Sequence, residues 1–169
     1  MPSTSFTSPT TATNDTGIGT TAWTIVSVTN CTCPVDKTTS NYLEMTGYGF
    51  ALPTGATIAG IEATITCGGI AGGTLYAQLM KSNSVVGTAK SVSPYASTTF
   101  GDASDLWGTG WTEAEVESSG FGVAIWAVGS ANGDTVTMTG ATIRITYTTG
   151  AGGAPGSSTS GHFLFTWIF

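Results

Sequence analysis

A group of acidic side chains lies in one stretch of the sequence, and paired carboxylates are the catalytic groups of glycoside hydrolases. The group comprises Asp102, Asp105, Glu113, Glu115 and Glu117. Acidic residues also cap turns and favour helix N-termini, and Thr112 with Glu115 has the spacing of a capping box. This spacing predicts a single helical turn over residues 113–118. We favour the structural role, and we predict that the chain is not an enzyme and has no catalytic residue.

The other residue types that do chemistry lack partners at a useful spacing. The single histidine, His162, lies far along the chain, so a Ser/His/Asp arrangement is not supported. Residues 102–105 lack the dense Asp/Asn spacing of a calcium loop. The glycine-rich residues 68–73 lack the Lys and the helix that follow a phosphate-binding loop. We therefore predict no metal and no cofactor.

The cysteines are Cys31, Cys33 and Cys67. The one-residue spacing of Cys31 and Cys33 does not fit a CxxC redox or zinc motif. Two interpretations stay open. The thiols are either buried and without function, or Cys31 or Cys33 forms a disulfide that leaves one thiol able to crosslink subunits.

Three tryptophans are candidates for stacking on sugar rings: Trp107, Trp111 and Trp126. Such aromatic residues belong to the core more often than to a binding surface. Trp107-Gly-Thr-Gly-Trp111 has the composition of a loop corner, and we predict that both of its tryptophans serve packing.

Composition restricts the partners. Charged residues make up 8% of the chain, against about 25% in an ordinary soluble domain, and the net charge is −6. The cationic residues are Lys37, Lys81, Lys90 and Arg144. Because so few cations cannot follow nucleic-acid phosphates, we predict no nucleic-acid partner. No run approaches the roughly 20 apolar residues of a membrane helix, so we predict no membrane partner.

Alternating side chains identify the main strands. Residues 61–67 (IEATITC) and 141–148 (ATIRITYT) each alternate apolar and polar types, which gives a strand one apolar and one polar face. Abundant Thr and 24 Gly suit strands and tight turns. Asn132-Gly133 is typical of a hairpin turn, and residues 30–41 are predicted to form a polar loop. We predict an all-β protein, an antiparallel β-sandwich.

The two ends differ from the central part. We predict an extended N-terminal arm over residues 1–21, the β-sandwich domain over residues 22–149, and a flexible Gly/Ser linker over residues 150–161. Residues 162–169 (HFLFTWIF) would form a C-terminal apolar docking peptide, on another chain or back on its own domain. Its candidate partner-binding residues are Phe163, Leu164, Phe165, Trp167, Ile168 and Phe169.

Three segments, in this order, share a distinctive wording: SNYLEMTGYGFALPTGATIAGIEATI (Ser40 to Ile65), FGDASDLWGTGWTEAEVESSGFGVAI (Phe100 to Ile125) and VTMTGATIRITYT (Val136 to Thr148). Together they resemble a family of small β-sandwich structural proteins found in the virions of tailed bacteriophages and prophages. The resemblance covers residues 23–149. It implies a jelly-roll-like module on a capsid or tail surface, and it carries over no active site.

From this resemblance we expect a capsid-decoration or head-fibre protein that forms a homo-oligomer and binds other virion proteins through its termini. Two alternatives stay open. One is a tail-fibre or adhesin module that binds host surface glycans through an exposed aromatic platform or a groove. The other is a self-polymerising filament subunit that donates residues 162–169 from chain to chain. The first residues show no secretory signal, so we expect synthesis in the bacterial cytoplasm and a location on the virion surface.

Overall fold

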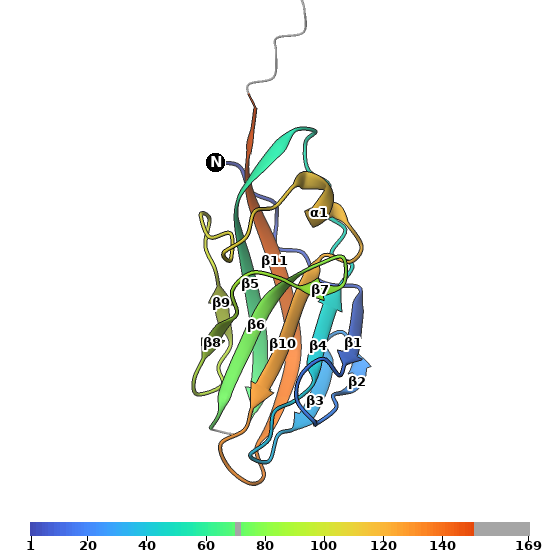
Figure 1. Cartoon of the computed structure of the whole chain (residues 1–169), viewed down its shortest axis with the longest axis vertical. Coiled ribbons are helices and arrows are strands. Elements are labelled where there is room, and N and C mark those ends of the chain that lie inside the picture. The colour runs from blue at the N-terminus through green and yellow to red at the C-terminus, as the bar shows by residue number, and fades with distance from the viewer. Residues whose placement is uncertain (70–71, 151–169) are drawn as a thin grey trace, which may run out of the picture.

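The computed structural model describes residues 1–69 and 72–150, which form two antiparallel sheets packed face to face (Figure 1). The β11 sheet has the order β2-β3-β11-β5-β9, and the β10 sheet has the order β1-β4-β10-β6-β7, with β8 also paired to β6. The strands are β1 (Thr11–Asp15), β2 (Thr24–Ser27), β3 (Asn30–Pro34), β4 (Tyr42–Thr46), β5 (Ala56–Gly69), β6 (Thr74–Lys81), β7 (Ser84–Val85), β8 (Lys90–Val92), β9 (Thr98–Phe100), β10 (Gly122–Val128) and β11 (Thr135–Thr149). One short helix, α1 (Glu113–Glu117), precedes β10.

The strand pairing is nested, which defines the fold as a jelly roll. Counted inward from the two ends, β3 pairs with β11, β4 with β10, β5 with β9, and β6 with β8, all antiparallel. Such a chain resembles one long hairpin rolled up so that successive pairs alternate between two sheets. The all-β, jelly-roll-like antiparallel sandwich predicted from the sequence is confirmed.

The core lies between the sheets because alternation along each strand turns one row of side chains inward. Ile61 and Ile65 of β5 and Ile143 and Ile145 of β11 are fully buried. The two strands located by their alternating sequence, β5 and β11, pair with each other from end to end, with β-bulges after Met138 and Thr146 of β11. Each fully buried Ile contributes about 1.5–3 kcal/mol relative to an exposed one, so these paired strands supply much of the core.

The N-terminal residues, predicted as an extended arm over residues 1–21, are held on the sandwich. β1 forms the edge of the β10 sheet beside β4, and residues 2–7 lie along β11. Thr4 N and Thr7 N donate to Ile145 O and Ile143 O, each at 2.9 Å. The physical reason is that β3 pairs only with residues 135–138 of β11 and leaves the rest of that edge unpaired. Unpaired edge groups attract another strand, and the chain's own first residues occupy this edge.

Two local predictions are wrong. Residues 30–34 form β3 rather than a loop, because Cys31 and Cys33 are buried like ordinary apolar residues while Thr32 faces outward. Asn132-Gly133 does not close a hairpin, because β10 and β11 lie in different sheets. Gly133 alone of the two has a positive φ, +85°, so the turn is not of the type that needs two such residues.

Candidate functional site

The acidic residues of α1 hold neighbouring loops in place. Glu113 Oε2 accepts hydrogen bonds from Gly55 N at 2.7 Å and Ala56 N at 3.2 Å, and Glu117 accepts one from Leu52 N. Glu115 Oε2 accepts from Thr112 N at 2.8 Å, and Thr112 Oγ1 accepts from Glu115 N at 3.3 Å. This reciprocal pair confirms the predicted capping box. The hydrogen bond from Thr112 N, with help from Lys81, lowers the pKa of Glu115.

Asp102 and Asp105 stabilise the loop before α1. Asp102 Oδ1 accepts from Ser104 N and Ser104 Oγ, each at 2.7 Å, and the bonds from Ser104 lower the pKa of Asp102. Asp105 Oδ1 accepts from Trp107 N at 2.7 Å, and its other oxygen pairs with Lys90. Every acidic group that suggested a hydrolase is thus engaged with a backbone N–H or a lysine.

Trp107 and Trp111 form a sealed corner under this loop, as the sequence predicts. Trp107 Nε1 donates to Ile61 O at 2.9 Å, and Trp111 Nε1 donates to Leu106 O at 3.0 Å. Both residues are buried. The loop approaches β5 closely at Gly60, where an added Cβ would lie 2.2 Å from Ala103 C. The tight approach and the hydrogen-bonded indole N–H groups make both tryptophans part of the packing at this corner.

The cysteines are free thiols in this structure. Cys31 and Cys33 point into the core from β3, and Cys67 is half-buried on β5. Burial raises the pKa of Cys33 to about 11 and raises the pKa of Cys31 and Cys67 as well. Since the thiolate is the reactive form, burial disfavours oxidation or metal binding at these positions.

Trp126 differs from the other candidate tryptophans because it lies on the outer face of the β10 sheet. There it stacks on Tyr76 of β6, with ring centroids 4.9 Å apart and ring planes 5° from parallel. Tyr42 of β4 meets Trp126 edge-on at 5.3 Å. Trp126 and Tyr76 are direct cross-strand partners, and such aromatic pairs are favourable in sheets. We call Tyr42, Trp126 and Tyr76 the aromatic row.

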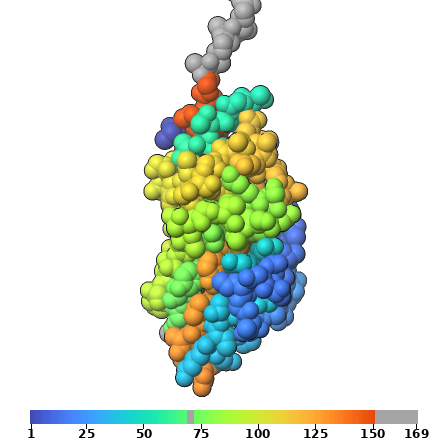
Figure 2. Space-filling model, viewed as in Figure 1, coloured from blue at the N-terminus to red at the C-terminus, as the bar shows by residue number. Residues whose placement is uncertain are grey.

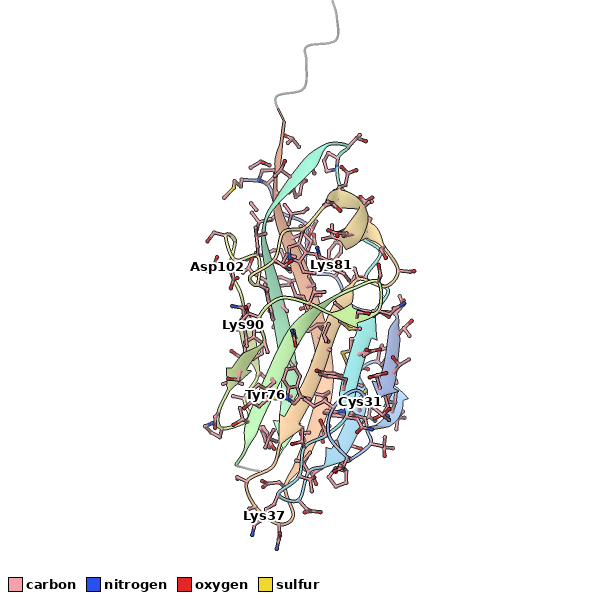
Figure 3. The ribbon with its side chains drawn as sticks, viewed as in Figure 1. Cys31, Lys37, Tyr76, Lys81, Lys90 and Asp102 are labelled. Carbon is pink, nitrogen blue, oxygen red and sulfur yellow. The ribbon has the colours of Figure 1, made fainter. Side chains whose placement is uncertain are left out.

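A groove of about 510 Å³ opens beside this row. Its lining residues are Ile18, Gly19, Thr20, Thr38, Thr39, Tyr76, Trp126 and Val128. It lies on the face shown in Figure 2, which carries the N-terminal residues in blue and β6 in green. Figure 3 places Tyr76 on this face, nearer to Lys37 than to the end of the sandwich where β11 finishes. The groove is therefore remote from both ends of the described chain.

A second hollow of about 320 Å³ lies on the other side of Tyr42. Its lining residues are Asp15, Gly17, Tyr42, Glu44, Asn83, Ser84 and Val85. Burial, and then the nearby Asp15, raise the pKa of Glu44. Tyr42 contributes to this hollow while touching Trp126 of the groove, so the two depressions flank one aromatic row.

Of these residues, the sequence indicates only Trp126 as a candidate for ligand binding, and it does not point to Tyr42, Tyr76 or the threonines around them. The row is assembled from three strands, and no sequence spacing brings residues 42, 76 and 126 together. One signal was present: Tyr42 and Tyr76 occupy the polar phase of their strands, where an aromatic residue faces outward. The predicted partner-binding residues of the C-terminal peptide, residues 162–169, lie outside the described residues.

Comparisons of the chain with protein-family models, curated proteins and solved structures find no match. Within the described residues, no group of three or more Cys, His, Asp or Glu side chains is placed to hold a metal ion. The described part of the chain also contains no helix long and apolar enough to cross a membrane.

Proposed function

We propose that this chain is a structural protein of a bacteriophage virion, of the capsid-decoration or head-fibre type, which forms a homo-oligomer and contacts neighbouring virion proteins through its termini. The sequence segments quoted above support the virion assignment. The fold agrees with what that resemblance implies, because jelly rolls are frequent in viral capsid proteins.

The observation that carries the assembly role is the way residues 2–7 are held on β11. Most of the contact consists of main-chain hydrogen bonds, including Ile143 N to Thr7 O and Tyr147 N to Pro2 O, each at 3.0 Å. Thr4 Oγ1 also accepts from Ile145 N at 3.0 Å, and Arg144 lies 4.6 Å from the centroid of the Phe6 ring. The apolar side chains of Met1 and Phe6 stay 74% and 44% exposed. Because main-chain pairing is independent of side-chain identity, the arm of one copy can occupy β11 of another with the same bonds.

The two ends of the described chain lie at the same end of the sandwich. Pro2 is bonded to Tyr147, close to where β11 ends at Thr149, and Figure 1 shows the N-terminus near this end of β11. Attachment through both termini would leave the opposite end free. Docking of residues 162–169, and the filament that their donation would build, remain predictions.

Arm exchange is tested with the double variant Ser3→Cys/Thr146→Cys, because these residues are bridge partners in antiparallel pairing. Under mild oxidation of concentrated protein, exchange gives a covalent dimer or ladder on a non-reducing gel. The single variants Ser3→Cys and Thr146→Cys are the controls. An intramolecular crosslink alone, with a monomeric mass by light scattering, would contradict assembly through the arm.

The virion assignment needs a separate measurement. Antibodies raised against the purified chain should decorate phage particles in electron micrographs, and mass spectrometry should find the chain in density-purified particles. If the chain is abundant in the lysate but absent from purified particles, the virion assignment is wrong.

A further inference from the structure

The geometry points to a binding site for a neutral oligosaccharide in the groove beside the aromatic row. This inference does not rest on the virion assignment, since it depends only on the outer face of the β10 sheet. Four features of this face support it: the fixed positions of the three rings, the unpaired indole N–H of Trp126, the uncharged lining of the groove and the size of the groove.

The rings are held in fixed positions. Trp126 lies between Tyr76 and Tyr42, in face-to-face contact with the first and edge-to-face contact with the second. All three come from paired strands, because β10 is hydrogen-bonded to β4 on one side and β6 on the other. A ligand would therefore meet a wall that is already ordered, and little conformational entropy would be lost there on binding.

The indole N–H of Trp126 has no acceptor among the described residues, whereas Trp23, Trp107 and Trp111 each donate to a backbone carbonyl. Trp126 is only 8% exposed. Its nitrogen is nonetheless not fully buried. Within residues 1–69 and 72–150, the buried side-chain polar atom without a hydrogen-bond partner is Tyr95 Oη, so the unpaired Trp126 Nε1 must reach solvent. A nearly buried aromatic side chain with an open donor is suited to orient a ligand.

The groove is uncharged, which selects among ligand classes. None of its lining residues is ionisable at neutral pH, and its other polar groups are the hydroxyls of Thr20, Thr38, Thr39 and Tyr76. The next hollow contributes Asp15 and Glu44. Lys81 and Lys90, on the strands beside the row, pair with Glu115 and Asp105. Lys37 is exposed and precedes Thr38 in the chain, but it does not line the groove. Phosphorylated, sulfated or sialylated ligands would thus find no cation among the lining residues.

A neutral sugar matches these groups. Its hydroxyl oxygens can accept from Trp126 Nε1 and exchange hydrogen bonds with the threonine hydroxyls. Its C–H groups can pack on the partly exposed ring of Tyr76. The groove volume of about 510 Å³ lies within the roughly 300–1,000 Å³ typical of ligand sites. The hollow beyond Tyr42 offers room for further units, so a chain of sugars fits better than a single one.

The test uses the full chain and a defined set of probes. These are hexasaccharides of glucose, mannose and N-acetylglucosamine as neutral ligands, with sialyllactose and a sulfated heparin hexasaccharide as anionic ones. Titration calorimetry at low and high salt measures each affinity. We expect millimolar or tighter binding of a neutral hexasaccharide with little salt dependence, and no measurable binding of the anionic probes.

Variants locate the site. Trp126→Phe removes the open N–H but breaks no hydrogen bond within the described chain, so it should fold normally and weaken binding about tenfold. Tyr76→Ala should weaken binding at least as much. Gln78→Ala is the matched control, because Gln78 follows Tyr76 on the same face of β6 without lining the groove, and it should change affinity by less than about twofold.

Several outcomes would overturn the site. These are no binding of any neutral hexasaccharide at about 10 mM, equal affinity of Trp126→Phe and the unmodified chain, or a preference for the sulfated probe. If a neutral hexasaccharide binds, arrays of purified bacterial surface polysaccharides and of free oligosaccharides would distinguish a cell-surface ligand from a soluble one.

Discussion

The corner under α1 and the aromatic row are both built around tryptophan, but the indole N–H is hydrogen-bonded at the corner and has no acceptor among the described residues in the row. At the corner, Trp107 and Trp111 donate to Ile61 O and Leu106 O, and lysines lie over both rings, with Lys90 Nζ 5.1 Å from the centroid of Trp107. In the row, Trp126 has ring partners on two sides and no acceptor among the described residues. A buried side chain whose polar atoms are all paired serves stability. One that is ordered but incompletely paired is available for binding.

The two regions should differ most in how much stability a Trp→Phe substitution costs. Trp107→Phe leaves Ile61 O without its partner and opens a void in the core, so the free energy of unfolding should fall by about 2–4 kcal/mol. Trp126→Phe breaks no hydrogen bond within the described chain and lies on an outer face, so it should cost less than about 1 kcal/mol. Chemical denaturation of both variants checks the pair. Equal losses would remove the distinction between the two regions.

Carboxylates in the two regions should respond to neutralisation with opposite sign. The pKa of Glu115 is lowered by Thr112 N and Lys81, so its charge stabilises the fold at neutral pH and this contribution disappears as pH falls through the folded-state pKa. Glu115→Gln should therefore cost a few tenths of a kcal/mol at pH 7, after allowance for its exposure, and nothing at pH 3.

The pKa of Glu44 is raised by burial and by Asp15, so its ionised form opposes folding once the pH exceeds the unfolded-state pKa. Glu44→Gln should thus stabilise the protein by about 0.5 kcal/mol at pH 7, with the difference shrinking at acidic pH. Unfolding curves of both variants across pH 3 to 8 decide the matter. A loss of stability on neutralising Glu44 at pH 7 would show that this carboxylate is paired after all.

The smallest effect is expected at Tyr76. Tyr76 is only partly buried on the outer face of the β10 sheet, and Phe keeps its ring, so Tyr76→Phe should leave the melting temperature nearly unchanged, within about 0.5 kcal/mol of stability. Thermal unfolding followed by circular dichroism gives the answer. A fall in melting temperature comparable with that of Trp107→Phe would mean that the aromatic row stabilises the fold as the corner does.

The sequence predicts the parts of the fold that depend on neighbouring residues. Alternation located β5 and β11, and Thr112 with Glu115 located α1, because burial on one face and capping are local requirements. The predicted hairpin at Asn132-Gly133 is wrong, because the same turn residues serve whether the next strand pairs with the preceding one or crosses to the opposite sheet.

Features that depend on the backbone or on distant strands could not be predicted in this way. Residues 2–7 are held largely by main-chain hydrogen bonds to β11, with Thr4 Oγ1 accepting from Ile145 N and Arg144 lying over the Phe6 ring. The main-chain part of this contact leaves no side-chain pattern in the arm. The aromatic row needs β4, β6 and β10 to lie side by side, and only the jelly-roll order establishes this arrangement. The candidate site was therefore visible in one residue, Trp126, and became a site only once the strands were assembled.

The most direct test of the account is hydrogen exchange at the tryptophan indole groups, observed by nuclear magnetic resonance of ¹⁵N-labelled protein and assigned with single Trp→Phe variants. The indole N–H of Trp126 should exchange with solvent rapidly, and its resonance should shift when a neutral hexasaccharide is added. Those of Trp23, Trp107 and Trp111 should be protected and unmoved, because each is bonded to a backbone carbonyl. Protection of Trp126 equal to that of the other three would contradict the claim that its donor is open for binding.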